Sequence, residues 1–227
     1  MMISPETYYE EHLKGKTAAK IMTTIRALKK EINQLKKTVE NPVYVSKMNP
    51  DERVRIWCNR MYLERSKLAL TEAGGEYVPT KSELAAAALD ESMPSLTKMT
   101  FSIGGYFSGY EKHTFTVDGD KITEKVVYTY LYSSSYVDKT TTYEYDKAEL
   151  LDGLRKLHIG EWLRKYSIER WGVVFLEGTQ WLLEMEFSNG HKPVKIDGDN
   201  DYPYNFGELL GLLGIEDVPQ FYSDKNE

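Results

Sequence analysis

The sequence predicts an α+β protein, with an N-terminal antiparallel helical hairpin like a coiled coil, followed by an antiparallel β-sheet domain with two or three packed helices. Apolar residues at heptad spacing predict long helices in the first third of the chain. Short alternating stretches between tight turns predict strands in the rest. Helices and strands in separate parts of a chain are typical of α+β folds. We expect a helical region over residues 1–94, a sheet domain over 95–216 and a polar tail over 217–227.

The helical hairpin is expected at about residues 17–73, after a short helix that starts at Ser4-Pro5. The seam of its first long helix has a 4-3-4-3-4 spacing and consists of Ile21, Ile25, Leu28, Ile32, Leu35 and Val39. The second helix is expected to begin with Asn49 as its cap and to end at Gly74-Gly75. Its expected seam consists of Val54, Cys58, Met61 and Leu68, with Trp57 and Tyr62 beside them.

Heptad seams pair helices between chains as well as within one chain. The seam over residues 21–39 therefore predicts either the hairpin or a homodimer, and both arrangements stay open. A short alanine-rich helix over residues 82–92 is expected to precede the sheet.

The sheet domain is organised around the stretch from Trp171 to Leu213. Four apolar residues from Trp181 to Phe187 alternate with Leu182, Glu184 and Glu186, which is the two-residue period of a strand with one buried face. Asn189-Gly190 then predicts a tight hairpin turn. Earlier strands are predicted around Phe101, Phe115, Ile122 to Tyr132 and Tyr136 to Tyr145, and a helix around Leu150 to Leu157. Successive strands with tight turns predict an antiparallel meander.

The net charge of −6 conceals an asymmetry along the chain. Residues 1–70 contain 14 Lys and Arg against 8 Asp and Glu, whereas the remainder contains 15 against 27. This split predicts either separate partners for the two parts or docking of the basic part on the acidic part. A single cysteine excludes an internal disulfide, and no apolar run is long enough to cross a membrane. We expect a cytoplasmic protein with no membrane partner.

Three segments near the C-terminus resemble a known pattern. They are residues 181–190, residues 198–206 and residues 208–210. The pattern is W-x-L-x-[IM]-x-F-x-x-G followed by G-x-N-x-Y-P-x-N-F, found in an uncharacterised protein family of Gram-positive bacteria and their mobile elements. The resemblance covers residues 98–215 and implies no activity. Small proteins of such elements include inhibitors of bacterial immunity such as anti-CRISPR proteins, so the resemblance implies an anti-defence inhibitor by context.

An acidic turn predicts a calcium site. Its candidate ligands match positions 1, 3, 5, 9 and 12 of a calcium-binding loop and are Asp197, Asp199, Asp201, Asn205 and Glu208. Tyr202 occupies position 6, where the turn of such a loop requires glycine. The alternative is a solvated turn in which Asn205 caps the last helix. No other cofactor is expected.

A group of tyrosines predicts a protein-binding surface, because tyrosine offers a rigid ring with a polar tip. The group consists of Tyr128, Tyr130, Tyr132, Tyr136, Tyr143 and Tyr145. The alternative is aromatic pairing across neighbouring strands.

The first helices also offer a basic surface that predicts contact with nucleic acid, because lysine side chains neutralise phosphates. Its candidate residues are Lys16, Lys20, Arg26, Lys29, Lys30, Lys36 and Lys37, with Lys14 nearby. The alternative is a solvated helix face, and no recognisable nucleic-acid module accompanies these residues.

No catalytic motif is present. Cys58 lies on an expected apolar seam, where a thiol is usually inert. The four histidines are scattered, and Glu184 and Glu186 on one strand face are candidates for paired carboxylates or for a solvated surface. The sequence therefore favours a non-enzymatic macromolecule-binding protein with a protein partner. The alternatives are a nucleic-acid-binding protein and a metal-dependent hydrolase.

Overall fold

The computed structural model describes residues 2–46, 49–105, 109–129, 143–174 and 178–215. Its fold is α+β, as predicted, and the chain divides into two compact units, unit 1 (residues 1–80) and unit 2 (residues 81–227). We predicted the boundary at residue 94. It lies earlier because Leu89 and Met93, in and after helix α4 (Lys81–Ser92), are buried in the core of unit 2. The predicted polar tail lies outside the described residues. Within them, no helix is long and apolar enough to cross a membrane.

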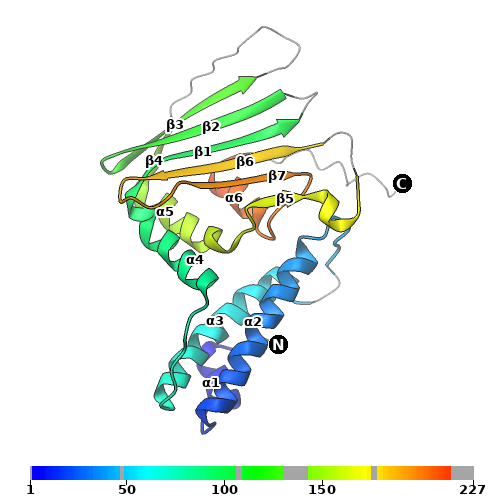
Figure 1. Cartoon of the computed structure of the whole chain (residues 1–227), viewed down its shortest axis with the longest axis vertical. Helices are drawn as coiled ribbons and strands as arrows, with labels where there is room; N and C mark the ends of the chain where they lie inside the picture. The colour runs from blue at the N-terminus through cyan, green and yellow to red at the C-terminus, as the bar shows by residue number, and fades with distance from the viewer. Residues whose placement is uncertain (1, 47–48, 106–108, 130–142, 175–177, 216–227) are drawn as a thin grey trace. The chain divides into compact units, whose positions relative to one another are not determined.

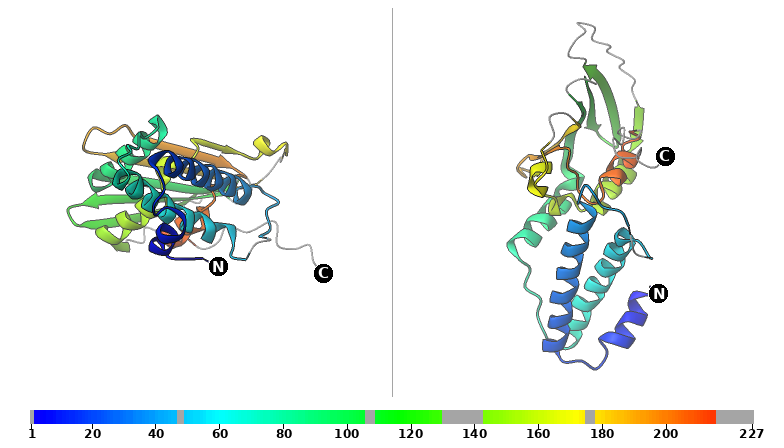
Figure 2. Two further views of the ribbon diagram at one scale, coloured as in Figure 1. Left: turned by 90° about the horizontal axis from the view of Figure 1, so that it is seen from below. Right: turned by 90° about the vertical axis from the view of Figure 1, so that its right-hand side faces the viewer.

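Unit 1 consists of helices α1 (Pro5–His12), α2 (Ala18–Val39) and α3 (Glu52–Glu72), and α2 and α3 lie side by side as an antiparallel pair (Figure 2). All six residues of the predicted α2 seam, from Ile21 to Val39, are buried, and Ile25 is 0% exposed. The hairpin prediction is therefore confirmed. Because the 21–39 seam is already covered within the chain, it offers no free apolar face for the predicted homodimer.

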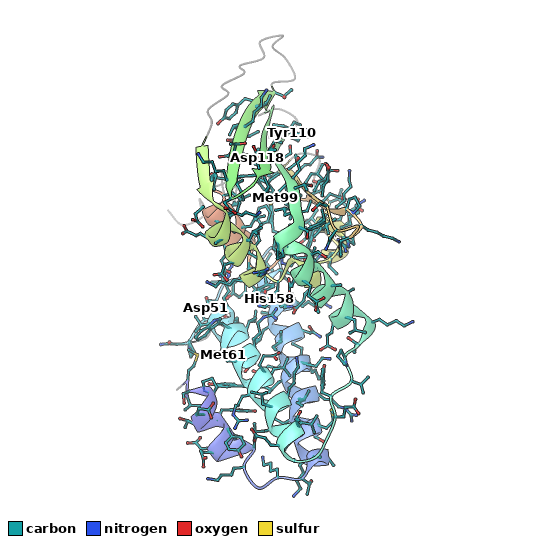
Figure 3. The ribbon with its side chains drawn as sticks, turned by 90° about the vertical axis from the view of Figure 1, so that its left-hand side faces the viewer. Asp51, Met61, Met99, Tyr110, Asp118 and His158 are labelled. Carbon is teal, nitrogen blue, oxygen red and sulfur yellow. The ribbon has the colours of Figure 1, made fainter. Side chains whose placement is uncertain are left out.

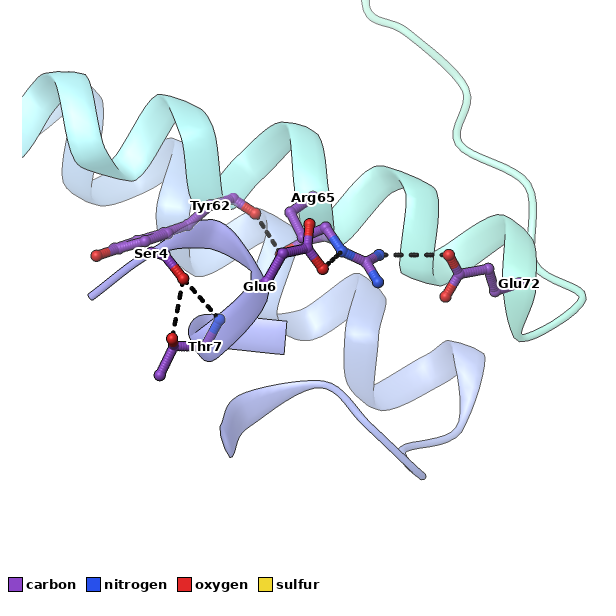
Figure 4. Close-up of polar contacts among 7 residues, drawn as sticks. Ser4, Glu6, Thr7, Tyr62, Arg65 and Glu72 are labelled. Carbon is purple, nitrogen blue, oxygen red and sulfur yellow. Dashed lines mark hydrogen bonds and ion pairs between the residues drawn. The ribbon is translucent and has the colours of Figure 1, made fainter. Parts of the chain in front are cut away.

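Helix α1 packs on α3 through aromatic and ionic contacts, of which Figure 4 draws the polar ones. Ser4 caps α1 as predicted, by accepting a hydrogen bond from a backbone N–H of its first turn. The rings of Tyr8 and Tyr62 stack with centroids 4.2 Å apart. Arg65 on α3 lies 3.4 Å from Glu6. These contacts cover one flank of α3, so α3 is buried on two sides.

The predicted seam of α3 is largely wrong. Val54, Trp57 and Leu68 are exposed, Trp57 by 60% and Leu68 by 61%. Only Cys58 and Tyr62 of the predicted set are buried, and Met61, labelled in Figure 3, is half-buried. The buried residues of α3 that the prediction omitted are Glu52, Ile56, Asn59, Leu63, Ser66, Ala69 and Leu70.

One fact explains this error, and a separate correction concerns the start of the helix. Small and polar residues such as Ser66 form part of the true seam. The hydroxyl of Ser66 donates to the backbone oxygen of Tyr62 at 2.7 Å. The helix also begins two residues later than expected, because Asp51 and not Asn49 caps it, accepting from the N–H of Arg53 at 2.7 Å.

The described residues of unit 2 form one seven-stranded sheet in the order β4-β3-β2-β1-β6-β7-β5 (Figure 1). The strands are β1 (Leu96–Gly105), β2 (Gly109–Asp118), β3 (Lys121–Thr129), β4 (Tyr143–Asp146), β5 (Lys165–Ser167), β6 (Gln180–Phe187) and β7 (Val194–Asp199). Neighbouring strands are antiparallel except β5 and β7. The predicted meander and the Asn189-Gly190 hairpin are confirmed for the described strands.

One face of the sheet carries the core of unit 2. Alternate residues on its strands, including Phe101, Phe115, Ile122, Leu183 and Ile196, are buried against α4, α5 (Lys147–Lys156) and α6 (Phe206–Leu212). The side chains between them point to the opposite face, because strand residues alternate in direction. We call this opposite side the outer face.

Candidate functional site

The outer face is the candidate site, because the buried residues of α4, α5 and α6 pack on the opposite face of the sheet. Strand pairing places residues from five strands in neighbouring rows. Two such rows consist of Tyr110, Gly104, Gln180, Asp199 and Ser167, and of Lys112, Ser102, Leu182, Asp197 and Lys165. Side chains of one row lie beside those of the next. Distant segments of the chain therefore contribute to one continuous polar surface.

The outer face is hollowed at these rows, in a groove of about 570 Å³. The lining includes the small residues Ser102 and Ser167, and Gly104, which pairs with Tyr110 and Gln180 of the lining, has no side chain. A Cβ atom on Gly104 would lie 2.1 Å from the backbone oxygen of Gly109, so the strand admits only glycine there. Beside Gly104, the hydroxyl of Tyr110 donates to Gln180 Oε1 at 2.6 Å. The groove thus has small residues in and beside its lining and a fixed polar edge.

The groove and the outer face beside it carry groups of both charges. Lys165 and Asp197 are direct partners in the pairing of β5 with β7. Lys195, also in the lining, donates to Glu184 Oε1 at 2.9 Å. Glu186 lies 3.6 Å from Lys98. The two glutamates that were candidates for a catalytic carboxylate pair are therefore each matched with a lysine.

A buried polar cluster that the sequence did not predict lies on the core side of the sheet. His113 is 4% exposed, and its Nδ1 lies 2.5 Å from Glu124 Oε1. Its Nε2 lies 3.0 Å from Glu111 Oε1. The hydroxyls of Tyr145 and Tyr128 donate to Glu124 at 2.8 Å and to Glu111 at 2.9 Å. Glu124 could have predicted this cluster, because it lies on the same face of β3 as buried Ile122 and Val126.

This cluster has the residue types of acid–base chemistry but not the access. His113 and Glu124 are buried, and the Phe115 ring stacks near His113 with centroids 6.4 Å apart. The Tyr145 hydroxyl also lies 3.4 Å from the backbone oxygen of Leu213, after α6. The cluster therefore ties β2, β3 and β4 to the helical layer.

Of the predicted tyrosine surface, Tyr130, Tyr132 and Tyr136 lie outside the described residues. Tyr143 begins β4. Tyr128 and Tyr145 belong to the buried cluster just described, so they do not contribute to the outer face. Tyr110, which the prediction omitted, is the tyrosine that lines the groove.

The predicted calcium ligand Asp201 has other partners. It is 2% exposed, and its carboxylate accepts from Arg170 Nη2 at 3.0 Å and from Trp171 Nε1 at 3.2 Å. Arg170 Nε contacts the second carboxylate oxygen. The backbone oxygen of Asp201 accepts from Trp181 Nε1 at 2.9 Å. Asp201 therefore fastens the chain after β7 to the core.

The other candidate calcium ligands point in different directions. Asp197 and Asp199 lie on β7 facing the groove, and Glu208 is exposed on α6. Asn205 is buried and donates through Nδ2 to the backbone oxygen of Leu157 at 2.9 Å. Among the described residues, no group of three or more His, Cys, Asp or Glu could hold a metal ion. Asp201 and Asn205 are thus held by contacts within the fold, and calcium binding at this turn stays a prediction.

Packing accounts for the C-terminal sequence pattern. A Cβ atom on Gly198 would lie 2.1 Å from Trp181 Nε1, so the indole occupies the space of a side chain there. The Phe206 ring packs against Trp181 with centroids 4.9 Å apart. Asp201 and Asn205 hold the intervening turn through the bonds given above. These residues stabilise the fold through buried contacts, and they do not form an exposed group of functional side chains.

The predicted basic residues fall into two groups. Lys29 and Lys36 are half-buried on the flanks of α2, and Lys29 donates to the Tyr77 hydroxyl at 2.9 Å. The exposed group consists of Lys16, Lys20, Arg26, Lys30 and Lys37.

Cys58 is buried as expected, and its Sγ lies 3.1 Å from Met2 Sδ. Burial raises the pKa of the Cys58 thiol, so less of it is the reactive thiolate at neutral pH.

No family model, curated protein or solved structure matches this chain.

Proposed function

We propose that this is a non-enzymatic protein that binds another protein through the outer face of unit 2. The observation that carries the proposal is the groove, a hollow assembled from β1, β2, β5, β6 and β7 on the side of the sheet away from its helices. Buried contacts hold its strands in place, such as the hydrogen bond from Trp181 Nε1 to the backbone oxygen of Asp201. A rigid, preformed surface reduces the entropy lost when a partner binds.

The chemistry of the groove supports a protein as the partner. Lys165, Lys195, Asp197 and Asp199 give it both signs of charge within a small area, and Tyr110 and Leu182 add apolar surface. Protein interfaces combine such a polar rim with aromatic and aliphatic contacts. With Glu169, the lining contains three acids against two lysines, so it does not favour a polyanion such as nucleic acid.

The charge of unit 2 supports a basic partner. Residues 81–227 contain 15 Lys and Arg against 25 Asp and Glu, so the unit has a net charge of −10. A net negative charge raises the association rate of a positively charged protein, and salt weakens this effect. Nucleases that act in bacterial defence bind nucleic acid and carry basic grooves, so the resemblance to mobile-element proteins makes them the partners to test first. In that role the protein would be an inhibitor.

The test compares two variants that each add an arginine to the outer face. Ser102→Arg fills the groove, whereas Thr116→Arg, on an exposed position of β2 away from the groove lining, is the matched control. Each tagged protein is incubated with a nuclease-treated lysate of the source organism, and retained proteins are quantified. A partner retained by the unaltered protein and by Thr116→Arg, but lost with Ser102→Arg, supports the proposal.

Equal retention by all three proteins, or no retained partner, contradicts it. Circular dichroism of both variants shows whether the fold is kept.

A further inference from the structure

The solvent side of α2 is strongly cationic. The helix contains six Lys and Arg and one acid, Glu31. That acid is turned toward α3, where its Oε1 contacts Arg55 Nη2 at 2.5 Å. The side of α2 opposite its buried seam therefore carries basic groups without a carboxylate of its own helix.

Helical geometry aligns three of these basic groups. At 100° per residue, Arg26, Lys30 and Lys37 lie within about 40° of one another, on the side opposite to buried Leu28 and Ile32. A rise of 1.5 Å per residue separates Arg26 from Lys30 by about 6 Å and Lys30 from Lys37 by about 10 Å. All three are exposed, and none forms an ion pair within the described residues. We call Arg26, Lys30 and Lys37 the cationic stripe.

The neighbours of the stripe favour a nucleic-acid backbone over bases. Thr23, Asn33 and Gln34 lie on the same side and can donate or accept hydrogen bonds. Helix α2 contains no aromatic residue, so it offers no surface on which unpaired bases could stack. Phosphates neutralised by lysine and arginine release bound counterions, which drives association without sequence preference.

We propose that the cationic stripe contacts the phosphate backbone of double-stranded DNA without reading its sequence. This inference concerns unit 1 and does not rest on the protein-binding proposal for unit 2. Three phosphate contacts give weak binding, with a slope of about −3 when the logarithm of the association constant is plotted against the logarithm of salt concentration. The acidic character of unit 2 opposes contact of duplex DNA with that unit.

The test measures fluorescence anisotropy of a labelled 20-base-pair DNA duplex with the full chain at about 50 mM NaCl. The stripe variant carries Arg26→Glu, Lys30→Glu and Lys37→Glu. The matched control carries Lys81→Glu, Lys156→Glu and Lys192→Glu, three exposed lysines of unit 2, and so has the same net charge. We expect the stripe variant to bind at least about tenfold more weakly than the unaltered protein and the control to stay within about threefold of it.

Three results would overturn the proposal. One is the absence of duplex binding by the unaltered protein, and another is an equal loss in both variants, which would show an effect of net charge alone. The third is tighter binding of the corresponding single strand, which would assign the ligand to unpaired nucleic acid. Thermal unfolding of the stripe variant serves as the folding control, since the three side chains are exposed.

Discussion

The interactions that stabilise unit 1 internally differ in kind from those that stabilise unit 2. In unit 1, the α2 seam repeats one kind of contact, aliphatic side chains every three or four residues. In unit 2, single polar groups in fixed positions join segments far apart in the chain, such as Asp201 with Arg170 and Glu124 with His113 and Tyr145. Aliphatic contacts depend on volume, whereas buried polar contacts depend on the position of individual atoms. A substitution that conserves side-chain volume should therefore lower the free energy of unfolding less at the α2 seam of unit 1 than at a buried polar contact of unit 2.

The largest effect is expected from Asp201→Ala. The substitution leaves Arg170 and Trp171 without their shared acceptor, and removing one partner of a buried ion pair costs several kcal/mol. We expect a loss of about 3 kcal/mol in the free energy of unfolding, because Arg170 keeps some access to water. Urea unfolding measures this loss, and hydrogen exchange assigns it to unit 2.

Asp199→Ala is the matched control for that measurement, because Asp199 is exposed two residues earlier. It should change the free energy of unfolding by less than about 0.5 kcal/mol. Similar losses for the two alanine variants would refute the structural role given to Asp201.

A second effect is expected in the buried cluster. Glu124→Gln keeps the shape of the side chain but removes the anion that accepts from Tyr145 and contacts His113. Hydrogen bonds to a charged group contribute about 1.5–3 kcal/mol, so we expect a loss of about 2 kcal/mol. Glu184→Gln, which affects only a surface pair with Lys195, should cost less than about 0.5 kcal/mol. A larger loss of unfolding free energy from Glu184→Gln than from Glu124→Gln would show that Glu184, and not Glu124, is the carboxylate that stabilises the fold.

The same contrast explains what the sequence could predict. The α2 seam follows a period of 3.6 residues and the strands a period of two, so both elements and their buried faces were predictable. A polar residue in phase with apolar ones, such as Glu124 or Ser66, interrupts the pattern, and its partner lies elsewhere in the chain. The acidic turn matched a calcium loop because spacing alone does not show that Arg170 neutralises Asp201.

The groove was beyond prediction for a related reason. Its residues come from five strands, and only the strand order β2-β1-β6-β7-β5 brings Tyr110, Ser102 and Asp197 together. That order includes a parallel pair formed by the three residues of β5, which are too few to show a period. The basic residues of α2, in contrast, were predictable because one helix contains them all.

A smaller effect is expected in unit 1 from Ile25→Leu, which conserves volume at the most deeply buried position of the α2 seam. Such exchanges usually cost less than about 1.5 kcal/mol, and we expect about 1 kcal/mol. Urea unfolding with hydrogen exchange over α2 gives the measurement. A loss that equals or exceeds that of Glu124→Gln would show that unit 1 is as sensitive to atomic position as unit 2, and the proposed contrast would be wrong.

The smallest effect is expected on the exposed side of α3, from Leu68→Ala. Leu68 is 61% exposed, so truncation removes little buried surface and alanine favours the helix. We expect a change of less than about 0.5 kcal/mol. Leu63→Ala, on the buried side of the same helix, should cost about 2–3 kcal/mol because it leaves a cavity. Both variants lose the same atoms from one helix, so their difference in urea unfolding isolates burial. If the Leu68 variant were the less stable of the two, the seam predicted from heptad spacing would be the true one and the face assigned to α3 would be wrong.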